Sequence, residues 1–484
     1  MKKSTFHFLG LLIIFGMIFS ACQPTVQAPE APPVVEEPEK EEPPAEKPVE
    51  EKPEPTLAPP AEEVIMIDFW HSMGGDLGGI AIPEMANNFN ASQDKCYVEP
   101  IYQGSYDDAL KKLRASLQSE DVPAVMQLYD IGTRLMADLG MITPVQEFID
   151  KDNYDVSDLE PNVLAYYTVE GQQASMPFNT STPMLYYNKD MFATAGLDPE
   201  SPPRTFQEVW DAARVLTQKD AAGNVTVSGI SISIYGWFFE QFLAVSGGYY
   251  VNNANGRDAL AAEATFNSPE GVAILEWWKA MFDEGIMGNY GRVNADVRTA
   301  FYAEQTAMFI DSTAVLRGAM DTVDGKFEIG TAYMPRPNEE AFETSGTIIG
   351  GGSLWIISDS SPEEQDCAWE FIKYQASPEQ QAYWHTMSGY FPIRDTAYDV
   401  PLAQEWREQY PQFKTAVDQL HLAPNNRITQ GGLIGVFPTA RQTIEEAIEE
   451  VLEGVATPQE ALDKAALIVT DAIEEYNISM GLVD

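Results

Sequence analysis

Ile65-Met66-Ile67-Asp68-Phe69 is a short β-rich run that predicts the first strand of the folded part of this chain. Ile82 to Phe89 has helical spacing, and Cys96 to Ile101 predicts a second strand. Periodic helices alternate with short β-rich runs along the remaining sequence, which predicts an α/β fold with mostly parallel sheets. The 421 residues from 64 to 484 are too many for one compact core, so we expect two lobes.

Helix starts are well marked in the second half of the chain. Ser361, Ser377 and Thr457 each place a hydroxyl cap before Pro, with Glu or Gln three residues further on. These signals predict helices that begin after each cap. The end of the chain, from Pro438 to Tyr476, is expected to be mainly helical.

The first residues predict export. Met1-Lys2-Lys3 is cationic, Phe8 to Phe19 is almost wholly apolar, and small residues precede Cys22. The pattern resembles a bacterial lipoprotein signal, residues 1–21, whose removal exposes Cys22 for lipidation, although Phe19 stands where Leu is usual. An ordinary signal peptide or a retained membrane anchor is the alternative, but the apolar run is short for a span of about 20 residues.

Residues 22–63 predict a lipidated cysteine followed by a disordered Pro/Glu linker. From 23 to 63 the chain has 12 Glu, 3 Lys and no aromatic residue, so it cannot bury enough apolar surface to fold. Proline and like charges extend such a segment into a semi-rigid spacer. We therefore expect an exported body, lipid-anchored on the outer face of the cytoplasmic membrane and working just off its surface.

Charge and cysteine content narrow the function classes. The formal net charge of -45 disfavours nucleic acid binding and indicates a solvated acidic surface. Besides Cys22, only Cys96 and Cys367 occur, and they could pair in an oxidising exterior. The sequence does not decide whether their α-carbons approach closely enough, so a disulfide stays open.

Catalytic signatures are scarce. His71, His385 and His421 lie far apart in sequence, and no nucleophile elbow, zinc-protease motif or phosphate-binding glycine loop occurs. With 74 acidic residues in the chain, the number of carboxylates does not exclude a catalytic pair of the kind found in glycosidases. A lipid-anchored carbohydrate-active enzyme is therefore the alternative to a binding protein. We predict a binding protein that uses no metal or cofactor.

Aromatic and small polar residues follow the first three predicted strands. They lie in Phe69 to Gly75, Tyr102 to Tyr106 and Gln127 to Thr133. Ligands of open α/β sheets bind at this edge. Trp70 alone is explained as well by a core position, and Tyr102 as cover for an apolar edge. Together, aromatic faces beside hydroxyls, an amide and a carboxylate suit a polyol.

Longer segments carry a family resemblance. Besides those three loops, they are Met176 to Asp190, Ile348 to Trp355 and Trp384 to Ile393. In this order, from about 65 to 466, the chain resembles the periplasmic glycerol-3-phosphate-binding proteins, part of the maltose-binding-like class of ABC importer receptors.

The resemblance implies a type II, two-lobe periplasmic-binding-protein fold with a hinge and an interlobe cleft. Lobe one would be 64–180 plus 335–384, and lobe two 181–334 plus 385–484. A monomer that hands its solute to the transmembrane subunits of an ABC permease is expected.

The resemblance also implies a set of ligand contacts in that cleft. Tyr106, Ser181, Gly351 and Tyr390 match by identity, Asp130 replaces Glu, Trp237 matches one of two cleft tryptophans, and Ser312 or Thr313 falls at a polar contact. Trp70 is expected to add a further stacking face.

One position departs from the family. Leu433 stands where the family has a ligand-binding Arg, and Leu cannot replace the paired, charge-assisted hydrogen bonds of a guanidinium. A phosphate beside Asp130 would then be poorly neutralised, unless Arg427 or Arg441 substitutes. We predict a receptor for a sugar, oligosaccharide or polyol, with glycerol 3-phosphate or a glycerophosphodiester as the alternative.

Overall fold

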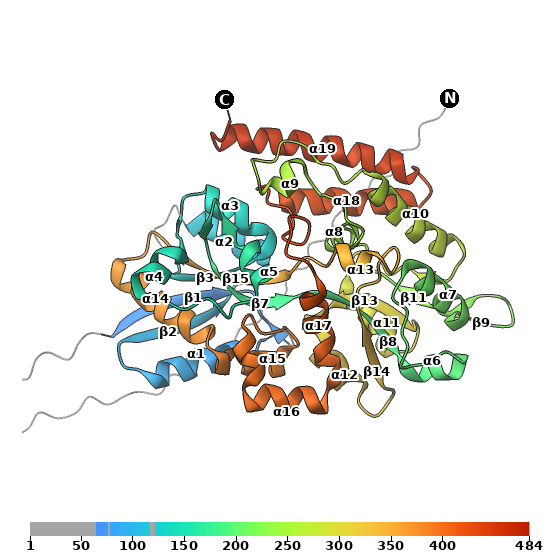
Figure 1. Ribbon diagram of the computed structural model, residues 1–484, viewed down its shortest axis with the longest axis horizontal. Helices are drawn as coiled ribbons and strands as arrows, with labels where there is room; N and C mark the ends of the chain where they lie inside the picture. Colours follow the sequence, from blue (N-terminus) through green and yellow to red (C-terminus); the bar gives the residue numbers. More distant parts are fainter. Residues whose placement is uncertain (1–63, 76–77, 117–121, 484) are drawn as a thin grey trace, which may run out of the picture. The chain divides into compact units, whose positions relative to one another are not determined.

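The computed structural model describes residues 64–75, 78–116 and 122–483, and two β-sheets organise this part of the chain (Figure 1). The first sheet has the order β2 (Cys96–Tyr102), β1 (Ile65–His71), β3 (Val125–Tyr129), β15 (Gly350–Ile357) and β4 (Ile142–Thr143), and β7 (Met176–Ser181) also pairs with β15. The second has the order β12 (Met287–Gly288), β11 (Ile230–Ser231), β13 (Met308–Ser312), β8 (Pro183–Asn188) and β14 (Ile329–Ala332). The predicted signal, Cys22 and linker lie outside the described residues.

Both sheets are mixed, so the expectation of mostly parallel sheets was wrong. β1 is parallel to β2 and β3, but β15 is antiparallel to β3, β4 and β7. In the second sheet β11 is parallel to β12 and β13, whereas β8 is antiparallel to β13 and β14. The antiparallel strands β8 and β15 are those by which the chain enters one sheet from the other. A βαβ crossover within one sheet makes neighbouring strands parallel, and a strand that enters from the other sheet does not have to follow that rule.

A continuous extended segment links the two sheets. β7 ends at Ser181 in the first sheet and β8 begins at Pro183 in the second, with only Thr182 between them. Both strands are buried along their whole length. This crossing agrees with the two-lobe expectation, while the exact lobe limits given above remain a prediction.

The first strand shows why the sequence folds as it does. Ile67 and Phe69 of β1 are buried, while Met66 and Asp68, which alternate with them, are exposed, as expected for the side chains of a strand. Phe69 packs on Phe371 of α14 (Pro362–Gln375), with ring centroids 5.2 Å apart. The expected helix after β1 is α1 (Ala81–Ser92), which buries one apolar face beneath the same sheet.

The remaining helices fall into three groups along the chain. Before β7 lie α2 (Tyr106–Ser116), α3 (Thr133–Asp138), α4 (Val145–Asp152) and α5 (Pro161–Tyr166). Between β8 and β15 lie α6 (Lys189–Ala195), α7 (Phe206–Leu216), α8 (Gly236–Val245), α9 (Asn252–Gly256), α10 (Pro269–Asp283), α11 (Asn294–Tyr302), α12 (Leu316–Val323) and α13 (Ala341–Thr344). After β15 and α14 come α15 (Pro378–Ser388), α16 (Pro401–Gln409), α17 (Thr415–Leu422), α18 (Phe437–Leu452) and α19 (Pro458–Ser479).

The predicted helix starts are confirmed. Ser361, Ser377 and Thr457 are the N-caps of α14, α15 and α19, and each side chain accepts a backbone N–H bond. A reciprocal capping box forms at Ser361 and Thr457 but not at Ser377, where only the cap bond is present. The C-terminal region is helical, as expected, through α18 and α19.

Cys96 and Cys367 form a disulfide, which settles the question that the sequence left open. Cys96 is the first residue of β2 and Cys367 lies in α14; their α-carbons are 5.8 Å apart, and the two residues are 271 positions apart in sequence. Both side chains are buried. The bond therefore fastens the covering helix α14 to the edge of the first sheet.

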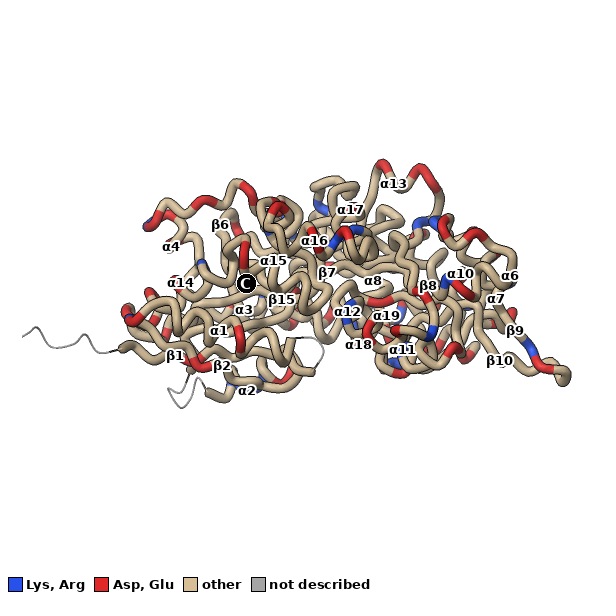
Figure 2. Tube along the Cα trace, turned by 90° about the horizontal axis from the view of Figure 1, so that it is seen from below, with Lys and Arg blue, Asp and Glu red and all other residues tan. Residues whose placement is uncertain are grey.

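Acidic residues are spread over many helices and loops, with Lys and Arg between them (Figure 2). This distribution agrees with a solvated acidic surface. Among the helices of the described ranges, none has the length and apolar character needed to cross a membrane.

Candidate functional site

A cavity of about 190 Å³ lies where strand ends of both sheets meet. β3, β7 and β15 of the first sheet and β13 of the second each bring residues to it, and loops and helices complete the wall. Its lining residues are Tyr106, Tyr129, Asp130, Ser181, Tyr235, Trp237, Asn294, Arg298, Asp311, Ser312, Ala314, Val315, Gly351, Tyr390 and Arg441. A solute held here would contact both sheets.

Gly351 can take its place only because it has no side chain. Its φ is +99°, and an added Cβ would lie 1.8 Å from the backbone oxygen of Asn179. In the β15 to β7 ladder, Gly351 is opposite Thr180 and Gly350 is opposite Ser181. The bare backbone of β15 thus lines the cavity beside the Ser181 hydroxyl.

A chain of hydrogen bonds orients Tyr106, the first residue of α2. The backbone N–H of Ser72 donates to Oε1 of Gln127 (2.9 Å), and Nε2 of Gln127 donates to Oδ1 of Asn179 (2.7 Å). Nδ2 of Asn179 then donates to Oη of Tyr106 (2.9 Å). Because the phenol oxygen already accepts this bond, its own proton is available to a solute. Tyr106 also stacks on Tyr129.

Arg441 of α18 connects two buried carboxylates. Its Nη2 lies 3.2 Å from Oδ2 of Asp130 and 2.7 Å from Oε2 of Glu240, and its Nε donates to the same Glu240 oxygen at 3.0 Å. Burial raises the pKa of Asp130, an effect that Arg441 only partly offsets. Burial likewise raises the pKa of Glu240 to about 7. The cation is therefore engaged by protein carboxylates on the wall of the cavity.

The second sheet contributes a looser charge pair. Asp311 of β13 is buried, which raises its pKa to about 6, and its Oδ2 lies 3.7 Å from Nε of Arg298 in α11. Arg298 keeps a quarter of its side chain exposed. Ser312 uses its hydroxyl to cap the following turn by accepting the N–H of Ala314 (3.1 Å). Arg298 is thus a weakly paired guanidinium at the cavity.

Aromatic rings and unused polar atoms complete the wall. Tyr390 is buried and stacks on Trp384 at 5.6 Å between ring centroids. Trp237 of α8 is buried, and its Nε1 donor has no hydrogen-bond partner in the described structure; the same holds for the buried Oδ1 acceptor of Asn294. Buried donors and acceptors are normally paired. One unpaired donor and one unpaired acceptor thus belong to residues that line a cavity that could hold a hydroxylated solute.

The structure brings most of the predicted site residues together. Those that line the cavity are Tyr106, Asp130, Ser181, Trp237, Ser312, Gly351 and Tyr390. Thr313 is buried next to Ser312 but is not part of the lining, so Ser312 is the better placed of the two. Trp70 is half-buried on β1 and does not line the cavity, which does not support its predicted stacking role.

Several lining residues were not predicted as contacts. Asn294 and Arg298 lie on α11, whose sequence has no recognisable site motif, and Asp311 immediately precedes the expected contact Ser312. Arg441, one of the two arginines that could substitute for the missing family arginine, lines the cavity. Leu433 is buried elsewhere, and its backbone N–H donates to the oxygen of Asn255 (2.8 Å).

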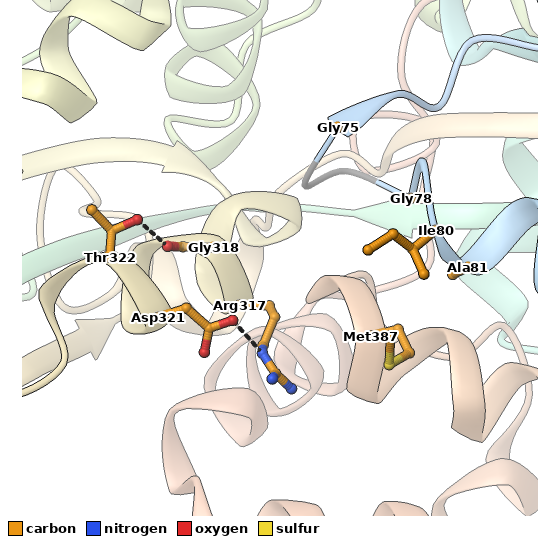
Figure 3. Close-up of a pocket in the computed structure, with 9 residues that line it drawn as sticks. All are labelled: Gly75, Gly78, Ile80, Ala81, Arg317, Gly318, Asp321, Thr322 and Met387. Carbon is orange, nitrogen blue, oxygen red and sulfur yellow. Dashed lines mark hydrogen bonds and ion pairs between the residues drawn. The ribbon is translucent and has the colours of Figure 1, made fainter.

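A larger cavity, of about 370 Å³, lies between α12, α15 and the start of α1 (Figure 3). Arg317 contributes to its wall, but its Nε donates to Asp321 (2.8 Å) and its Nη1 to the backbone oxygen of Thr386 (3.2 Å). The other lining groups are mainly glycines and aliphatic side chains. With no aromatic face and its guanidinium already bonded, this cavity is the poorer candidate for a solute.

Comparison with known proteins agrees with the geometry. Residues 84–415 match the family of bacterial extracellular solute-binding proteins. The sn-glycerol-3-phosphate-binding periplasmic protein UgpB of Escherichia coli K12 is 35% identical over 410 residues, which cover 84% of this chain and 92% of that protein.

Solved structures share the fold. UgpB from Mycobacterium tuberculosis, in complex with glycerophosphocholine, superposes with a TM-score of 0.72 at 23% identity and covers 85% of this chain and 99% of that one. The cyclic alpha-maltosyl-1,6-maltose binding protein of Arthrobacter globiformis gives a TM-score of 0.68 at 25% identity, covering 85% and 100%. The chain has the two-lobe maltose-binding-like fold and belongs to the bacterial extracellular solute-binding proteins, the receptor components of ABC importers, which bind solutes and are not enzymes.

Proposed function

We propose that this receptor binds a small hydroxylated solute, a polyol or monosaccharide, in the cavity between the two sheets. The observation that carries the proposal is the composition of the wall. Tyr106 and Trp237 offer aromatic faces and free donors, Asp130 and Ser181 offer acceptors, and Gly351 exposes its backbone. Such a set suits C–H faces that stack and hydroxyls that form directional hydrogen bonds.

The size of the cavity narrows the solute class. Pockets for drug-sized ligands have volumes of roughly 300–1,000 Å³, whereas this one encloses about 190 Å³. The volume favours a polyol or a single sugar ring over the oligosaccharide that the sequence left open. An oligosaccharide would fit only if the two lobes were further apart than they are in this structure.

Glycerol 3-phosphate or a glycerophosphodiester is the second candidate, supported by the ligand named for the Escherichia coli relative and by the position of Arg298. Arg298 is only loosely paired, so it could turn to a phosphate oxygen. Arg441 is less available because Asp130 and Glu240 both engage it. The two lining guanidiniums are matched by two lining carboxyls, Asp130 and Asp311, which favours a neutral solute.

The proposed mechanism is conformational. The solute binds between open lobes, its contacts to both sheets favour the closed state, and the permease recognises that closure.

We further propose that the receptor acts as a monomer tethered through a lipid on Cys22, with residues 23–63 as the spacer. The sequence around Cys22 and the composition of 23–63 support this part of the proposal.

Calorimetric titration tests the solute class. The chain would be titrated with glycerol 3-phosphate, glycerophosphodiesters, polyols, and neutral mono- and oligosaccharides. Binding of a neutral polyol or monosaccharide, unchanged in Arg298→Gln, is the expected result. Tight binding of a phosphate ester that is lost in Arg298→Gln would instead establish the second candidate. Binding of oligosaccharides alone would contradict the size argument.

A further inference from the structure

Three metal-ligating side chains from separate segments meet outside the solute cavity. They are Glu160, just before α5, Asp395, at the start of the 3-10 helix η4 (Asp395–Asp399), and His421, in the last turn of α17. Nε2 of His421 lies 2.9 Å from Oε1 of Glu160 and 3.9 Å from Oδ1 of Asp395. One ligand atom from each residue falls within 4.8 Å of the other two.

The backbone fixes the two carboxylates relative to each other. The N–H of Glu160 donates to the oxygen of Ile393 (2.9 Å), and the N–H of Asp395 donates to the oxygen of Asp158 (2.9 Å). Leu159 and Arg394 form an antiparallel bridge between these bonds. The two acidic residues are therefore held side by side before any ion arrives, which lowers the cost of ordering them.

His421 is held by the packing of α17. Two residues earlier, Nε2 of Gln419 donates to Oγ1 of Thr182 (3.0 Å) and to the oxygen of Pro183 (2.9 Å), both in the segment that crosses between the sheets. Nδ2 of Asn162 in α5 donates to the oxygen of Ala423 (3.2 Å) at the end of the helix. The backbone of α17 is thus held in place on both sides of His421.

The two carboxyl groups of the cluster have no Lys or Arg partner among the described residues. The side chain of Glu160 is only 4% exposed, and burial, with Asp395 close by, raises the pKa of its carboxyl. Arg394, the nearest arginine in sequence, is paired with Asp158 instead (3.5 Å). Within the described residues no Lys or Arg forms an ion pair with Glu160 or Asp395, so the imidazole of His421 is their one counter-group.

We propose that Glu160, Asp395 and His421 bind a divalent transition-metal ion of the zinc type. One imidazole and two carboxylates form a donor set that suits such ions better than Mg²⁺ or Ca²⁺, which take oxygen ligands. Bonds of about 2.0–2.2 Å to a common ion place ligand atoms about 3–3.5 Å apart. The 2.9 Å separation already fits, and Asp395, which is 63% exposed, can move to shorten the 3.9 Å one.

The ion would use the neutral imidazole, with the proton on Nδ1 and the lone pair of Nε2 directed at the metal. Solvent can reach the site because His421 is 49% exposed, so water molecules complete the coordination. The bound ion would join the strand-like segment 158–160 to α17, which is bonded to the crossing segment at Thr182. It would stabilise the fold at that point without touching the solute cavity.

Titration of the whole chain, without a polyhistidine tag, tests the site. Zn²⁺ is added to the protein freed of metals, heat is measured, and Co²⁺ is used to record ligand-field absorption. His71 and His385 are buried, which leaves His421 as the exposed imidazole of the described residues. His7 and Cys22, outside the described residues, are replaced by Ala and Ser in every sample so that neither binds the added metal. We expect saturable binding of a single ion, a higher Tm with Zn²⁺, and no such effect of Mg²⁺ or Ca²⁺.

Variants separate this site from a general acidic surface. His421→Ala and Asp395→Asn should each weaken Zn²⁺ binding by at least the roughly 10–100-fold typical of losing an outer-shell partner. Asp399→Asn, an exposed carboxylate in the same turn, should leave binding unchanged. Absence of saturable binding, equal binding by His421→Ala, or a preference for Ca²⁺ would overturn the proposal. Solute affinity, measured with a chelator present, should be the same in all variants.

Discussion

Arg441 and Asp130 form a buried ion pair, with Nη2 3.2 Å from Oδ2, although 311 positions separate them in the chain. The same guanidinium bonds to Glu240, so one cation from α18 holds a carboxylate of the cavity wall and another behind it. A buried charge that loses its partner is costly, whereas one that keeps a second partner is tolerated. This triad is therefore expected to govern both the stability of the site and the charge it offers to a solute.

Replacing Asp130 by Asn should weaken binding of a neutral hydroxylated solute by about 10-fold or more, because a carboxylate acceptor contributes roughly 1.5–3 kcal/mol to a hydrogen bond. Stability should change little, since Arg441 keeps Glu240. Calorimetry and thermal unfolding measure the two effects. Asp359→Asn, an exposed and distant change, is the control. Stronger binding of a phosphate ester by Asp130→Asn would point to the anionic solute instead.

Glu240 should make the protein less stable as pH rises. The pKa of Glu240 is about 7 in the folded protein, compared with the ordinary value of 4.5 that it has in the unfolded chain. Burial raises this pKa more than the attraction of Arg441 lowers it. Between these pH values the folded protein keeps a proton that the unfolded chain releases. The stability linked to this group is thus fully present below pH 4.5 and is lost as pH rises to about 7.

Glu240→Gln isolates that contribution, since Asp130, Asp311 and the other titrating groups remain in both proteins. Denaturant unfolding should give similar free energies near pH 4.5, and at pH 8 the Gln variant should be more stable by on the order of 3 kcal/mol. A Gln variant that is less stable at pH 8 would show that the ionised pair with Arg441 is net stabilising.

The disulfide between Cys96 and Cys367 should contribute several kcal/mol. It closes a long loop between β2 and α14, and loss of a native disulfide typically costs about 2–5 kcal/mol. The variant Cys96→Ser with Cys367→Ser should unfold at a lower temperature than the parent. A reductant should lower the Tm of the parent by a similar amount and leave the double variant unchanged; equal Tm values for all samples would contradict a structural role.

The sequence predicted the local features better than the long-range ones. Helix caps such as Ser361 and Thr457 depend on residues three positions apart, so they could be identified directly. The disulfide joins residues 271 positions apart, and its formation depends on how α14 packs on the first sheet. No local pattern contains that information.

The same distinction applies to the site. Tyr106 and Asp130 follow strands whose ends can be located in the sequence, whereas Ser181, the last residue of β7, was expected from the family resemblance. All three line the cavity. Asn294 and Arg298 lie on α11, whose sequence is typical of a surface helix. They reach the cavity because this helix lies next to β13, which is a property of the assembled fold.

Gly351 should not tolerate a side chain. At φ +99°, an alanine Cβ would meet the backbone oxygen of Asn179 at 1.8 Å, so β15 and β7 would have to separate. Strain and overpacking together are expected to cost about 2–5 kcal/mol. Gly140→Ala is a matched control, because its φ is +65° but nothing lies within 4 Å of the added Cβ. Unfolding free energies of the two variants should differ clearly; equal losses would mean that strain alone matters at Gly351.

Trp237 should serve the solute through its Nε1 donor, which has no partner in the described structure and lies on a residue that lines the cavity. Trp237→Phe keeps an aromatic face but removes the donor, so solute affinity should fall by about 10-fold. The Tm should change little, because the space left by the smaller ring joins the existing cavity instead of forming a new void in the core.

Trp278 provides the control for this change. Its Nε1 also lacks a partner, but the residue is fully buried in the core away from the cavity lining. Trp278→Phe should lower the Tm, because it leaves a void, and should not alter solute affinity. Trp237→Phe should therefore lower the affinity and leave the Tm nearly unchanged, whereas Trp278→Phe should lower the Tm and leave the affinity unchanged. If Trp237→Phe bound the solute as tightly as the parent, the indole would contribute only its face, and the hydrogen-bond role proposed for its N–H would be wrong.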